Sequence, residues 1–285
     1  CMPLYYFGTE EQKREYLPLL CSGKSIGSFG LTEPEAGSDA GGTKTTARLE
    51  DGQWVINGSK CYITNASYAQ FVTITAVTDK GQGTRGISNI IVPTATPGFI
   101  IRSSYEKLGL HGSNTTELFF DDVRVPEQNL LGKRGEGFKQ FLMVLDGGRI
   151  AIGAMGVGIA QACLDASLKY AKERVQFGQP IGKFQAIQFK LADMAMNIEL
   201  ARLMYLKAAW LKDTGQPYSR EANFAKLFGS EISTKAALEA IQIHGGYGYM
   251  REFPVERYLR DSKLLEIGEG TSEVIRLVIA RQLGL

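Results

Sequence analysis

The sequence predicts an α+β protein in which a central β-barrel or β-sandwich domain precedes a C-terminal four-helix bundle. Apolar residues recur with period two between Ser25 and Pro126, and with helical spacing after Gly137. Turn pairs such as Asn57-Gly58 and Pro97-Gly98 separate the strand-like runs. We therefore expect three parts: residues 1–24, residues 25–134 as the β domain, and residues 135–285 as the bundle.

The first part is a short helix over residues 9–20, with Thr9 as its N-cap and Gly23 after its end. One short helix cannot bury its own apolar face. Residues 1–24 are therefore expected to be the tail of a helical domain that begins upstream.

The β domain contains two segments with unusual chemistry. Residues 31–39 (LTEPEAGSD) place hydroxyls and free backbone amides in a loop after an apolar strand, where they could bind a flavin edge or a phosphate. A plain Pro/Gly turn is the alternative. Tyr62 and Thr64 lie two residues apart and hence on one strand face. That face suits a flavin ring and equally a barrel core.

The bundle is predicted from long apolar stripes with short breaks at Phe177-Gly178, Gly215–Pro217 and Gly245-Gly246. Ser219 is the expected N-cap of its third helix. One stripe consists of Ile187, Leu191, Met194, Ile198, Ala201 and Tyr205. Gly153, Gly156 and Gly158 interrupt the first helix, which indicates close approach of either a neighbouring helix or a ligand.

Composition excludes several functions. The 32 basic and 30 acidic residues give a net charge of +2, which is too balanced for a nucleic-acid partner. The four cysteines form no C-x-x-C pair and the two histidines no E-x-x-H motif, so no metal site is expected. The uncharged stretch from Ile150 to Cys163 is shorter than the ~20 residues of a membrane span.

Glu269 is the strongest candidate for catalysis. It stands between Gly268 and Gly270, just before an apolar helix that Thr271 or Ser272 could cap. A solvated turn is the ordinary explanation for Gly-Glu-Gly. However, a general base that must reach a C–H bond needs such a closely approachable backbone.

Taken together, four motifs give the chain a resemblance to the acyl-CoA dehydrogenase family: T-E-P-x-A-G-S-D, R-x-x-F-G, Q-x-x-G-G-x-G and E-G-T-S-E occur in the family's order. The resemblance implies FAD as cofactor and Glu269 as the base that removes the α-proton of an acyl-CoA. It also implies that the base found in other branches, next to Arg149, is absent, because that position is Gly148.

The same resemblance implies the remaining site residues. The cofactor contacts are Phe29, Leu31, Thr32, Ser38, Tyr62, Thr64, Arg174, Phe177, Gln185, Gln242, Gly245, Gly246, Thr271 and Glu273. The substrate contacts are Ser38, Asp146, Arg149, Gly270 and Arg281. The segment from Arg174 to Gln185, together with Gln242, Gly245 and Gly246, matches residues that reach the FAD of a neighbouring subunit, so we expect a homotetramer built as a dimer of dimers.

Gly268 stands where straight-chain enzymes often have tyrosine, so the expected substrate is a short- or medium-chain acyl-CoA, with branched or cyclic groups compatible. An electron-transferring flavoprotein is the expected acceptor, in the cytoplasm or the mitochondrial matrix. An acyl-CoA oxidase and a non-catalytic scaffold homologue are the alternatives.

Overall fold

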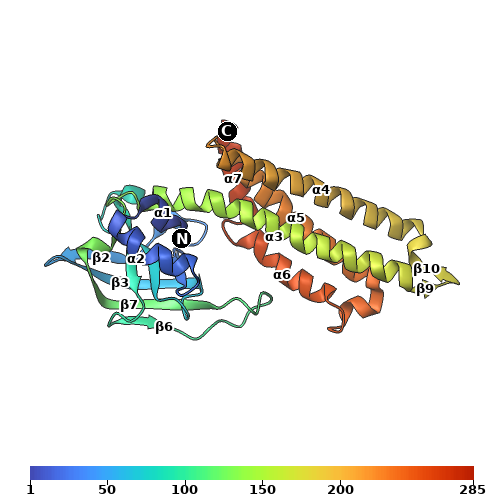
Figure 1. The fold of residues 1–285 in the computed structure, drawn as a ribbon, viewed down its shortest axis with the longest axis horizontal. Coiled ribbons are helices and arrows are strands. Elements are labelled where there is room, and N and C mark those ends of the chain that lie inside the picture. Colours follow the sequence, from blue (N-terminus) through green and yellow to red (C-terminus); the bar gives the residue numbers. More distant parts are fainter. The chain divides into compact units, whose positions relative to one another are not determined.

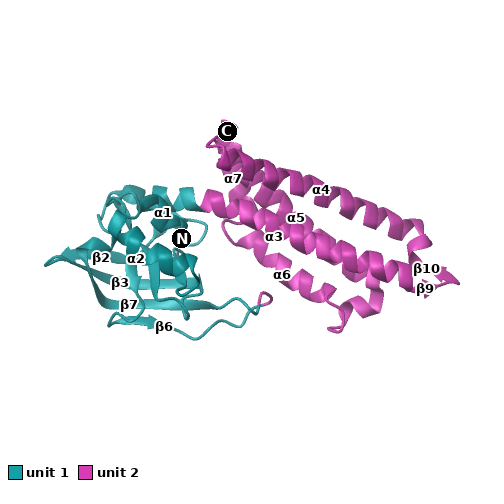
Figure 2. Ribbon diagram, viewed as in Figure 1, with its two compact units in different colours: residues 1–107, 111–144 teal, residues 108–110, 145–285 magenta.

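The computed structural model describes residues 1–285 and divides into two compact units. Unit 1 consists of Cys1–Lys107 and His111–Val144, and unit 2 consists of Leu108–Leu110 and Leu145–Leu285 (Figure 2). All strands of the main sheet belong to unit 1, and unit 2 is almost entirely helical. The predicted α+β class, with a β part followed by a helical part, is confirmed.

Unit 1 begins with two helices, α1 (Met2–Phe7) and α2 (Glu10–Cys21). Thr9 caps α2 as predicted: its hydroxyl accepts from the Gln12 N–H at 3.2 Å, and the Gln12 side chain accepts from the Thr9 N–H at 3.0 Å. This reciprocal capping box fixes where the helix starts. The apolar faces of the helices pack on the sheet in one cluster, formed by Leu4, Phe7, Tyr16, Leu17, Leu20, Phe71, Ile91 and Leu131.

One sheet of eight strands follows these helices in unit 1, which also contains the beginning of the helix that starts at Gly137 (Figure 1). The strands are β1 (Gly27–Gly30), β2 (Thr46–Glu50), β3 (Gln53–Thr64), β4 (Phe71–Val77), β5 (Ile87–Pro93), β6 (Phe99–Ile101), β7 (Thr115–Pro126) and β8 (Leu130–Leu131). Their order is β6-β7-β3-β2-β4-β5-β8, and β1 pairs in parallel with β4. The hairpin between β2 and β3 turns at Asp51 and Gly52, whose positive φ values of 49° and 76° suit a type I′ turn.

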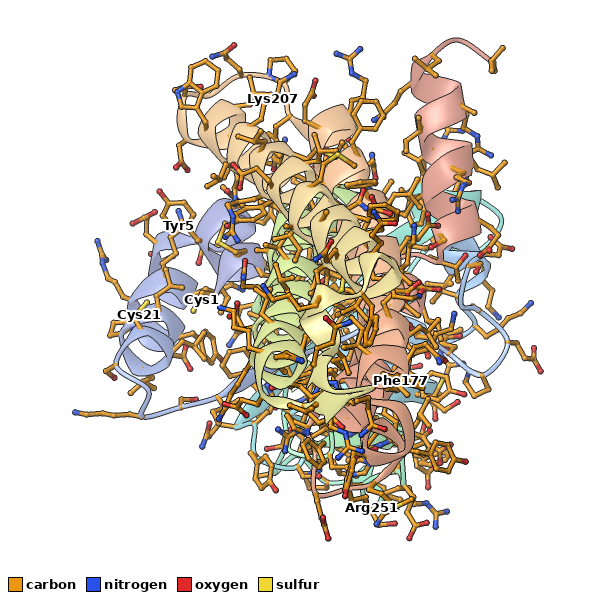
Figure 3. The ribbon with its side chains drawn as sticks, turned by 90° about the vertical axis from the view of Figure 1, so that its right-hand side faces the viewer. Cys1, Tyr5, Cys21, Phe177, Lys207 and Arg251 are labelled. Atoms are coloured by element: carbon orange, nitrogen blue, oxygen red, sulfur yellow. The ribbon has the colours of Figure 1, made fainter.

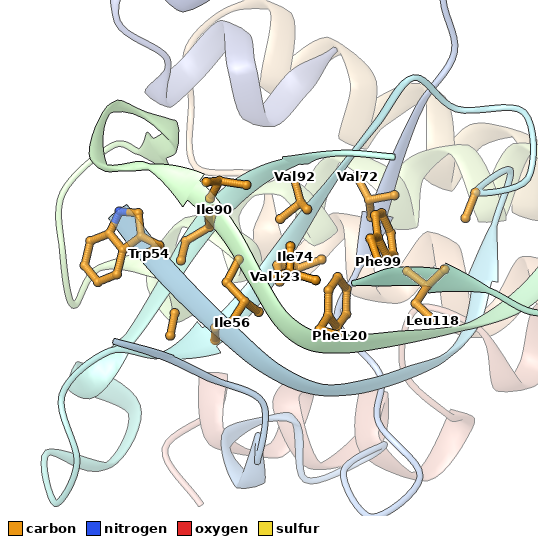
Figure 4. Close-up of a cluster of buried hydrophobic side chains, with 14 of the residues drawn as sticks. Trp54, Ile56, Val72, Ile74, Ile90, Val92, Phe99, Leu118, Phe120 and Val123 are labelled. Carbon is orange, nitrogen blue, oxygen red and sulfur yellow. The ribbon is translucent and has the colours of Figure 1, made fainter. Parts of the chain in front are cut away.

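The core of unit 1 shows that the sheet is curved (Figure 4). Phe99 on the edge strand β6 belongs to the same buried cluster as Ile90 and Val92 on β5, near the other end of the strand order. Trp54 and Ile74 from the middle of the sheet lie in that cluster as well. A flat sheet could not bring these strands around one core, so the sheet wraps around it as in a barrel.

The helices of the second half are α3 (Gly137–Glu173), α4 (Gln185–Asp213), α5 (Ser219–His244), α6 (Val255–Ile267) and α7 (Ser272–Gln282). A small hairpin of β9 (Val175–Gln176) and β10 (Gln179–Pro180) joins α3 to α4. All three predicted breaks fall between helices. Short 3₁₀ turns cover Ala40–Gly42, Gly83–Gly86, Glu127–Asn129, Ile181–Lys183 and Gly245–Tyr249.

The predicted stripe of α4 lies in the core of the bundle. Met194, Ile198 and Ala201 are buried, and the other members pack against the same cluster. The predicted N-cap of α5 is wrong by one residue, because Tyr218 is the N-cap and Ser219 is the first helical residue. The Ser219 hydroxyl instead accepts a hydrogen bond from Gln282 on α7 at 3.1 Å.

The glycines of α3 have two different surroundings. A Cβ on Gly156 would lie 2.2 Å from the Gly229 carbonyl, and one on Gly153 would lie 2.8 Å from the Ala225 carbonyl, so α5 packs against these positions. Gly158 has no atom within 4 Å of its Cβ position. Helix packing, rather than a ligand, therefore explains Gly153 and Gly156.

Helix α3 as a whole meets the length and composition criterion for a membrane span, although its uncharged stretch from Ile150 to Cys163 is too short by itself. The short uncharged stretch continues on both sides into a helix with few charges, and an 18-residue window of α3 reaches a mean hydropathy of 1.5. By length and composition alone α3 could cross a bilayer. Core helices of globular proteins meet the same criterion, and Val157, Ala160 and Cys163 of α3 do lie in the bundle core.

Candidate active site

The loop after β1 is held against β3 by a buried ion pair. Lys60 is fully buried, and its ammonium donates to Glu33 Oε1 at 2.7 Å and to the Leu31 carbonyl at 3.0 Å. Beside this pair, the Cys61 N–H donates to the Thr32 carbonyl at 2.9 Å. These contacts fix the backbone of two predicted site residues, Leu31 and Thr32, and leave both half-buried.

Tyr62 has a strained backbone conformation on β3. Its φ of 59° is rare for a bulky residue. The pairing of β3 with β7 shifts register between Lys60 and Ile63, which marks a β-bulge, and Tyr62 is 67% exposed there. Thr64, two residues further on, is exposed too. Strain of this kind is typically kept where a side chain has to reach a ligand.

The structure brings β1 next to this end of β3. The Ser28 hydroxyl donates to the Thr64 carbonyl at 2.5 Å, and the neighbouring Phe29 ring stacks on Phe141 at 5.4 Å. Five predicted cofactor residues therefore lie on β1 and β3 or directly after β1: Phe29, Leu31, Thr32, Tyr62 and Thr64. Ser38 is exposed beyond the turn that the Glu33–Ala36 bridge closes.

Glu269 lies in the turn between α6 and α7. Its φ is 54° and that of Gly270 is 101°, so the backbone is left-handed at a residue with a side chain. The Thr271 hydroxyl caps α7 as predicted, accepting from the Val274 N–H at 3.3 Å. The Glu269 N–H makes no hydrogen bond, and Oε2 of its carboxylate is buried without a partner. A buried polar atom without a partner costs about 1–3 kcal/mol, so it requires a reason.

Two buried cations hold the backbone of this turn. Lys226 on α5 is fully buried and donates to the Gly270 carbonyl at 2.6 Å. Arg149 on α3 is 5% exposed; its Nη1 contacts Asp146 Oδ1 at 2.8 Å and its Nε donates to the Glu269 carbonyl at 3.4 Å. Three predicted substrate contacts, Asp146, Arg149 and Gly270, thus belong to one cluster with Glu269.

The Glu269 carboxylate lies against Gly148. A Cβ at position 148 would be 2.2 Å from Oε2 and 2.7 Å from Oε1. A side chain at this position would occupy the place that the carboxylate holds. Gly148, the position at which the resemblance implies a base in other branches, therefore faces the Glu269 carboxylate.

Burial raises the pKa of Glu269 above the ordinary range of a glutamate, and Arg149 and Lys226 offset part of this effect. The pKa of Lys226 is itself lowered to about 8, first by burial and then by Arg149. A carboxylate with a raised pKa and a free oxygen is suited to accept a proton near neutral pH.

A separate cavity of about 550 Å³ lies at the other end of α5. Arg174, His244, Gly245 and Gly246 are among the residues that line it. The Arg174 guanidinium lies 5.5 Å from the Tyr247 ring centroid. A guanidinium beside glycine backbone suits a phosphate-containing group. None of the lining residues belongs to the Glu269 cluster.

The other predicted residues of the bundle lie around the helix ends. Phe177 is 93% exposed with a φ of 51°, on the surface of the β9–β10 turn (Figure 3). Gln185 is the first residue of α4, and Gln242 is exposed in the last turn of α5. Glu273 and Arg281 are exposed at the two ends of α7. Neither residue forms a hydrogen bond or ion pair with Oε2 of Glu269, which has no partner.

Sequence reasoning missed the lysines and one histidine. Lys60 and Lys226 read as ordinary solvated residues within a strand and a helix. Glu33, next to Thr32 in the T-E-P motif, was the only local indication that a buried lysine could have a charged partner. His244 stands within the Gln-x-x-Gly-Gly segment, and the structure buries it against Tyr170 with 4.3 Å between ring centroids.

Comparisons with known proteins identify the family of this chain. Residues 28–123 match the model of the acyl-CoA dehydrogenase middle domain, and residues 135–284 match that of the acyl-CoA dehydrogenase C-terminal domain. A probable acyl-CoA dehydrogenase of Bacillus subtilis is 67% identical over 282 residues, which cover 99% of this chain and 74% of the relative.

Two solved structures are similarly close. The butyryl-CoA dehydrogenase of Megasphaera elsdenii superimposes with a TM-score of 0.98 at 47% identity, over 100% of this chain and 75% of that one. A chain from a structure of the electron transferring flavoprotein of Acidaminococcus fermentans gives a TM-score of 0.97 at 50% identity, over 99% of this chain and 75% of that one.

Proposed function

This chain belongs to the acyl-CoA dehydrogenase family, and on that premise we propose that Glu269 is the base that removes the α-proton of a short- or medium-chain acyl-CoA. The predicted family, its enzyme class and its dependence on FAD are confirmed. The observation that carries the proposal for Glu269 is its buried, unpartnered Oε2 on a left-handed backbone between two glycines.

The arrangement suits abstraction of a carbon-bound proton. Oε2 of Glu269 takes the α-proton, and the electron pair left on the α-carbon forms the double bond as the β-hydrogen departs as hydride. The unpaired Glu269 N–H can donate to the thioester carbonyl oxygen, where negative charge develops. The surrounding burial excludes water that would otherwise solvate the carboxylate.

The residues around the proposed cofactor contacts fit FAD, which supplies the acceptor for the hydride when it is bound. We propose that Thr32, Tyr62 and Thr64 contact the ring and that Phe29 and Leu31 border it. The exposed Tyr62 on its strained backbone supports this assignment. Arg174, Gly245 and Gly246 line a cavity with space for part of a nucleotide. Gln185 and Gln242 lie at the ends of α4 and α5, and Phe177 lies in the β9–β10 turn.

We propose Ser38, Asp146, Arg149, Gly270 and Arg281 for the substrate, and Ser38, Thr271 and Glu273 for the cofactor's outer parts. Arg149 is 5% exposed and bonds to Asp146 and to the Glu269 carbonyl. These contacts directly support a role for Arg149 in holding the Glu269 turn.

The substrate proposal rests on Gly268. A Cβ there would meet only the Leu264 carbonyl, at 3.5 Å, so space remains where a larger side chain could stand. We propose an acyl group of roughly four to eight carbons that tolerates branching or a ring, with overlap between neighbouring lengths because one methylene is worth only about 1–3 kcal/mol. The similar butyryl-CoA dehydrogenase supports the short end of this range.

We further propose a homotetramer, built as a dimer of dimers. The exposed face of α4 carries Phe189, Met196, Leu203 and Trp210, each more than half exposed. Such a large apolar patch is typical of an interface between subunits. An electron-transferring flavoprotein is the proposed acceptor, supported by the similar chain from a structure of the electron transferring flavoprotein of Acidaminococcus fermentans. A bacterial cytoplasm or a mitochondrial matrix is the proposed location, since relatives of both origins exist.

Glu269→Gln tests the proposed role in the FAD-loaded enzyme. The amide keeps the shape of the side chain and removes the base, so turnover of butyryl-CoA with an artificial acceptor should fall by about 10²–10⁴ or more while FAD stays bound. Anaerobic bleaching of the flavin band isolates the same step. Glu252→Gln, at an exposed position, is the matched control. Activity of Glu269→Gln within a few-fold of the parent would place the base elsewhere.

A further inference from the structure

Lys226 is a buried charge to which the reaction described above assigns no task. It lies in the middle of α5 with no exposed surface, and its ammonium donates to the Gly270 carbonyl at 2.6 Å. A lysine is rarely buried completely unless a specific partner requires the charge. Here the partner is a neutral carbonyl in the turn that carries Glu269. The need to hold this turn therefore explains why a lysine is buried at position 226.

The turn needs such support because its backbone is unfavourable. Glu269 has a φ of 54° and Gly270 a φ of 101°, which an isolated segment would rarely adopt. The Gly270 carbonyl belongs to the peptide group directly after this bend. A charged hydrogen bond to it opposes rotation of that peptide, and Arg149 acts on the preceding Glu269 carbonyl from α3.

Lys226 also contributes to the charge balance around Glu269. Burial raises the pKa of the Glu269 carboxyl, and the positive charges of Arg149 and Lys226 lower it. Lys226 in turn is affected by burial and by Arg149, Glu269, Glu266 and Glu231. At neutral pH Lys226 is therefore one of two cations that oppose protonation of the base.

We propose that Lys226 is the positioning residue of the Glu269 turn: its ammonium holds the Gly270 carbonyl in place, and its positive charge acts on the Glu269 carboxylate. The inference rests on the proposed role of Glu269 as the base. Without the ammonium, Glu269 would need a higher pH to become ionised, and the turn could relax away from Gly148. Both effects lower turnover without removing any group that touches substrate.

The experiment compares Lys226→Met and Lys226→Gln with the parent, all as FAD-loaded enzymes, in kcat and kcat/KM for butyryl-CoA against pH. We expect the acid limb of kcat/KM to move up by about one pH unit in both variants, since an opposite charge near a carboxyl is worth about 1–3 units. Glutamine can still donate to the Gly270 carbonyl. We therefore expect Lys226→Gln to keep more of the plateau kcat than Lys226→Met.

Lys235→Met is the matched control, because Lys235 is an exposed lysine on the same helix. Its pH profile should equal that of the parent. If Lys226→Met does not fold, Lys226→Arg replaces it; this variant keeps the charge and should keep the acid limb in place even with a lower kcat.

If Lys226→Met and Lys226→Gln lower the flavin content or kcat but leave the acid limb unmoved, the proposal is overturned and Lys226 has a purely structural role. A moved acid limb in Lys226→Arg, which keeps the charge, would also overturn the proposal. Glu269→Gln, measured in parallel, separates the two levels: if it stays active, the proposed base is wrong, whereas an inactive Glu269→Gln with unmoved limbs refutes only the role of Lys226.

Discussion

Each unit buries a lysine beneath a loop, but the nearby glutamate is hydrogen-bonded at both oxygens in one unit and has an unpaired oxygen in the other. In unit 1, Glu33 Oε1 accepts from Lys60 at 2.7 Å and from the Thr45 N–H at 3.1 Å, and Oε2 accepts from the Lys44 N–H at 2.6 Å. In unit 2, Lys226 donates to a carbonyl instead, and Glu269 Oε2 has no partner.

The pKa values of the two carboxyls follow from this difference. Burial by itself would raise the pKa of Glu33, but Lys60, the backbone amide of Lys44 and Thr45 hold it below the ordinary value. Burial dominates for Glu269, and its pKa is raised. Both lysines have a pKa lowered to about 8, so the lysines are alike and the carboxylates differ. A fully paired buried carboxylate stabilises the fold, whereas an unpaired one remains available for chemistry.

The largest effect should come from breaking the paired site. Lys60→Met leaves the Glu33 carboxylate buried without its cation, and loss of one partner of a buried pair costs about 3–5 kcal/mol. Trp54 is buried in unit 1 and Trp210 is exposed in unit 2, so denaturant unfolding followed by fluorescence in a Trp210→Phe background reports on unit 1.

Lys44→Met is the control for this measurement, because only the backbone N–H of Lys44 contacts Glu33 and its side chain is exposed. It should change the free energy of unfolding by less than about 0.5 kcal/mol. Equal losses in Lys60→Met and Lys44→Met would contradict a stabilising role for the pair.

An intermediate effect should come from displacing the unpaired carboxylate. Gly148→Ala places a methyl group where Oε2 lies, 2.2 Å from the ideal Cβ, so the carboxylate has to move. A displacement of about 1 Å in a catalytic group can cost about 10²-fold in rate, and we expect kcat/KM to fall by that order. Steady-state kinetics with butyryl-CoA measures it.

Gly158→Ala provides the control on the same helix, since nothing lies within 4 Å of its Cβ position. Both alanines should favour the helix by up to about 1 kcal/mol relative to glycine, and only Gly148→Ala should slow turnover. Unchanged kinetics in Gly148→Ala would mean that the carboxylate position seen here is not the reactive one.

The smallest effect should be a gain in stability on removing the unpaired charge. The folded-state pKa of Glu269 lies above its unfolded value, so its contribution to stability is fully present below the unfolded pKa and is lost as pH rises through the folded pKa. Glu269→Gln resembles the protonated form at every pH. We expect it to match the parent at acidic pH and to exceed it by about 1 kcal/mol once the pH has passed the folded-state pKa of Glu269.

Thermal unfolding of the FAD-loaded enzyme from mildly acidic to mildly alkaline pH tests this difference. Glu252→Gln, an exposed substitution in the same unit, should follow the parent throughout. A Glu269→Gln variant that is less stable than the parent at alkaline pH would show that the carboxylate is satisfied after all.

Much of the fold could be predicted because its signals are local. The N-cap at Thr9 and the stripe on α4 each depend on residues a few positions apart. The predicted turn at Asn57-Gly58 is wrong, because both residues lie inside β3, where the register shifts between Ile56 and Gly58. Ser219 shows the limit of such reasoning: a favourable capping residue stood one position inside the helix, where it bonds to Gln282 instead.

By itself, the sequence determined the order of elements, the family motifs and a glutamate with glycines on both sides. Only the tertiary structure decided that this carboxylate lies against Gly148, that Arg149 holds its carbonyl from 120 residues away and that Lys226 holds the next one from 44 residues away. It likewise paired Lys60 with Glu33 across 27 residues. Periodicity and turn chemistry describe neighbours along the chain, whereas burial and the satisfaction of charges depend on which helices and strands come together.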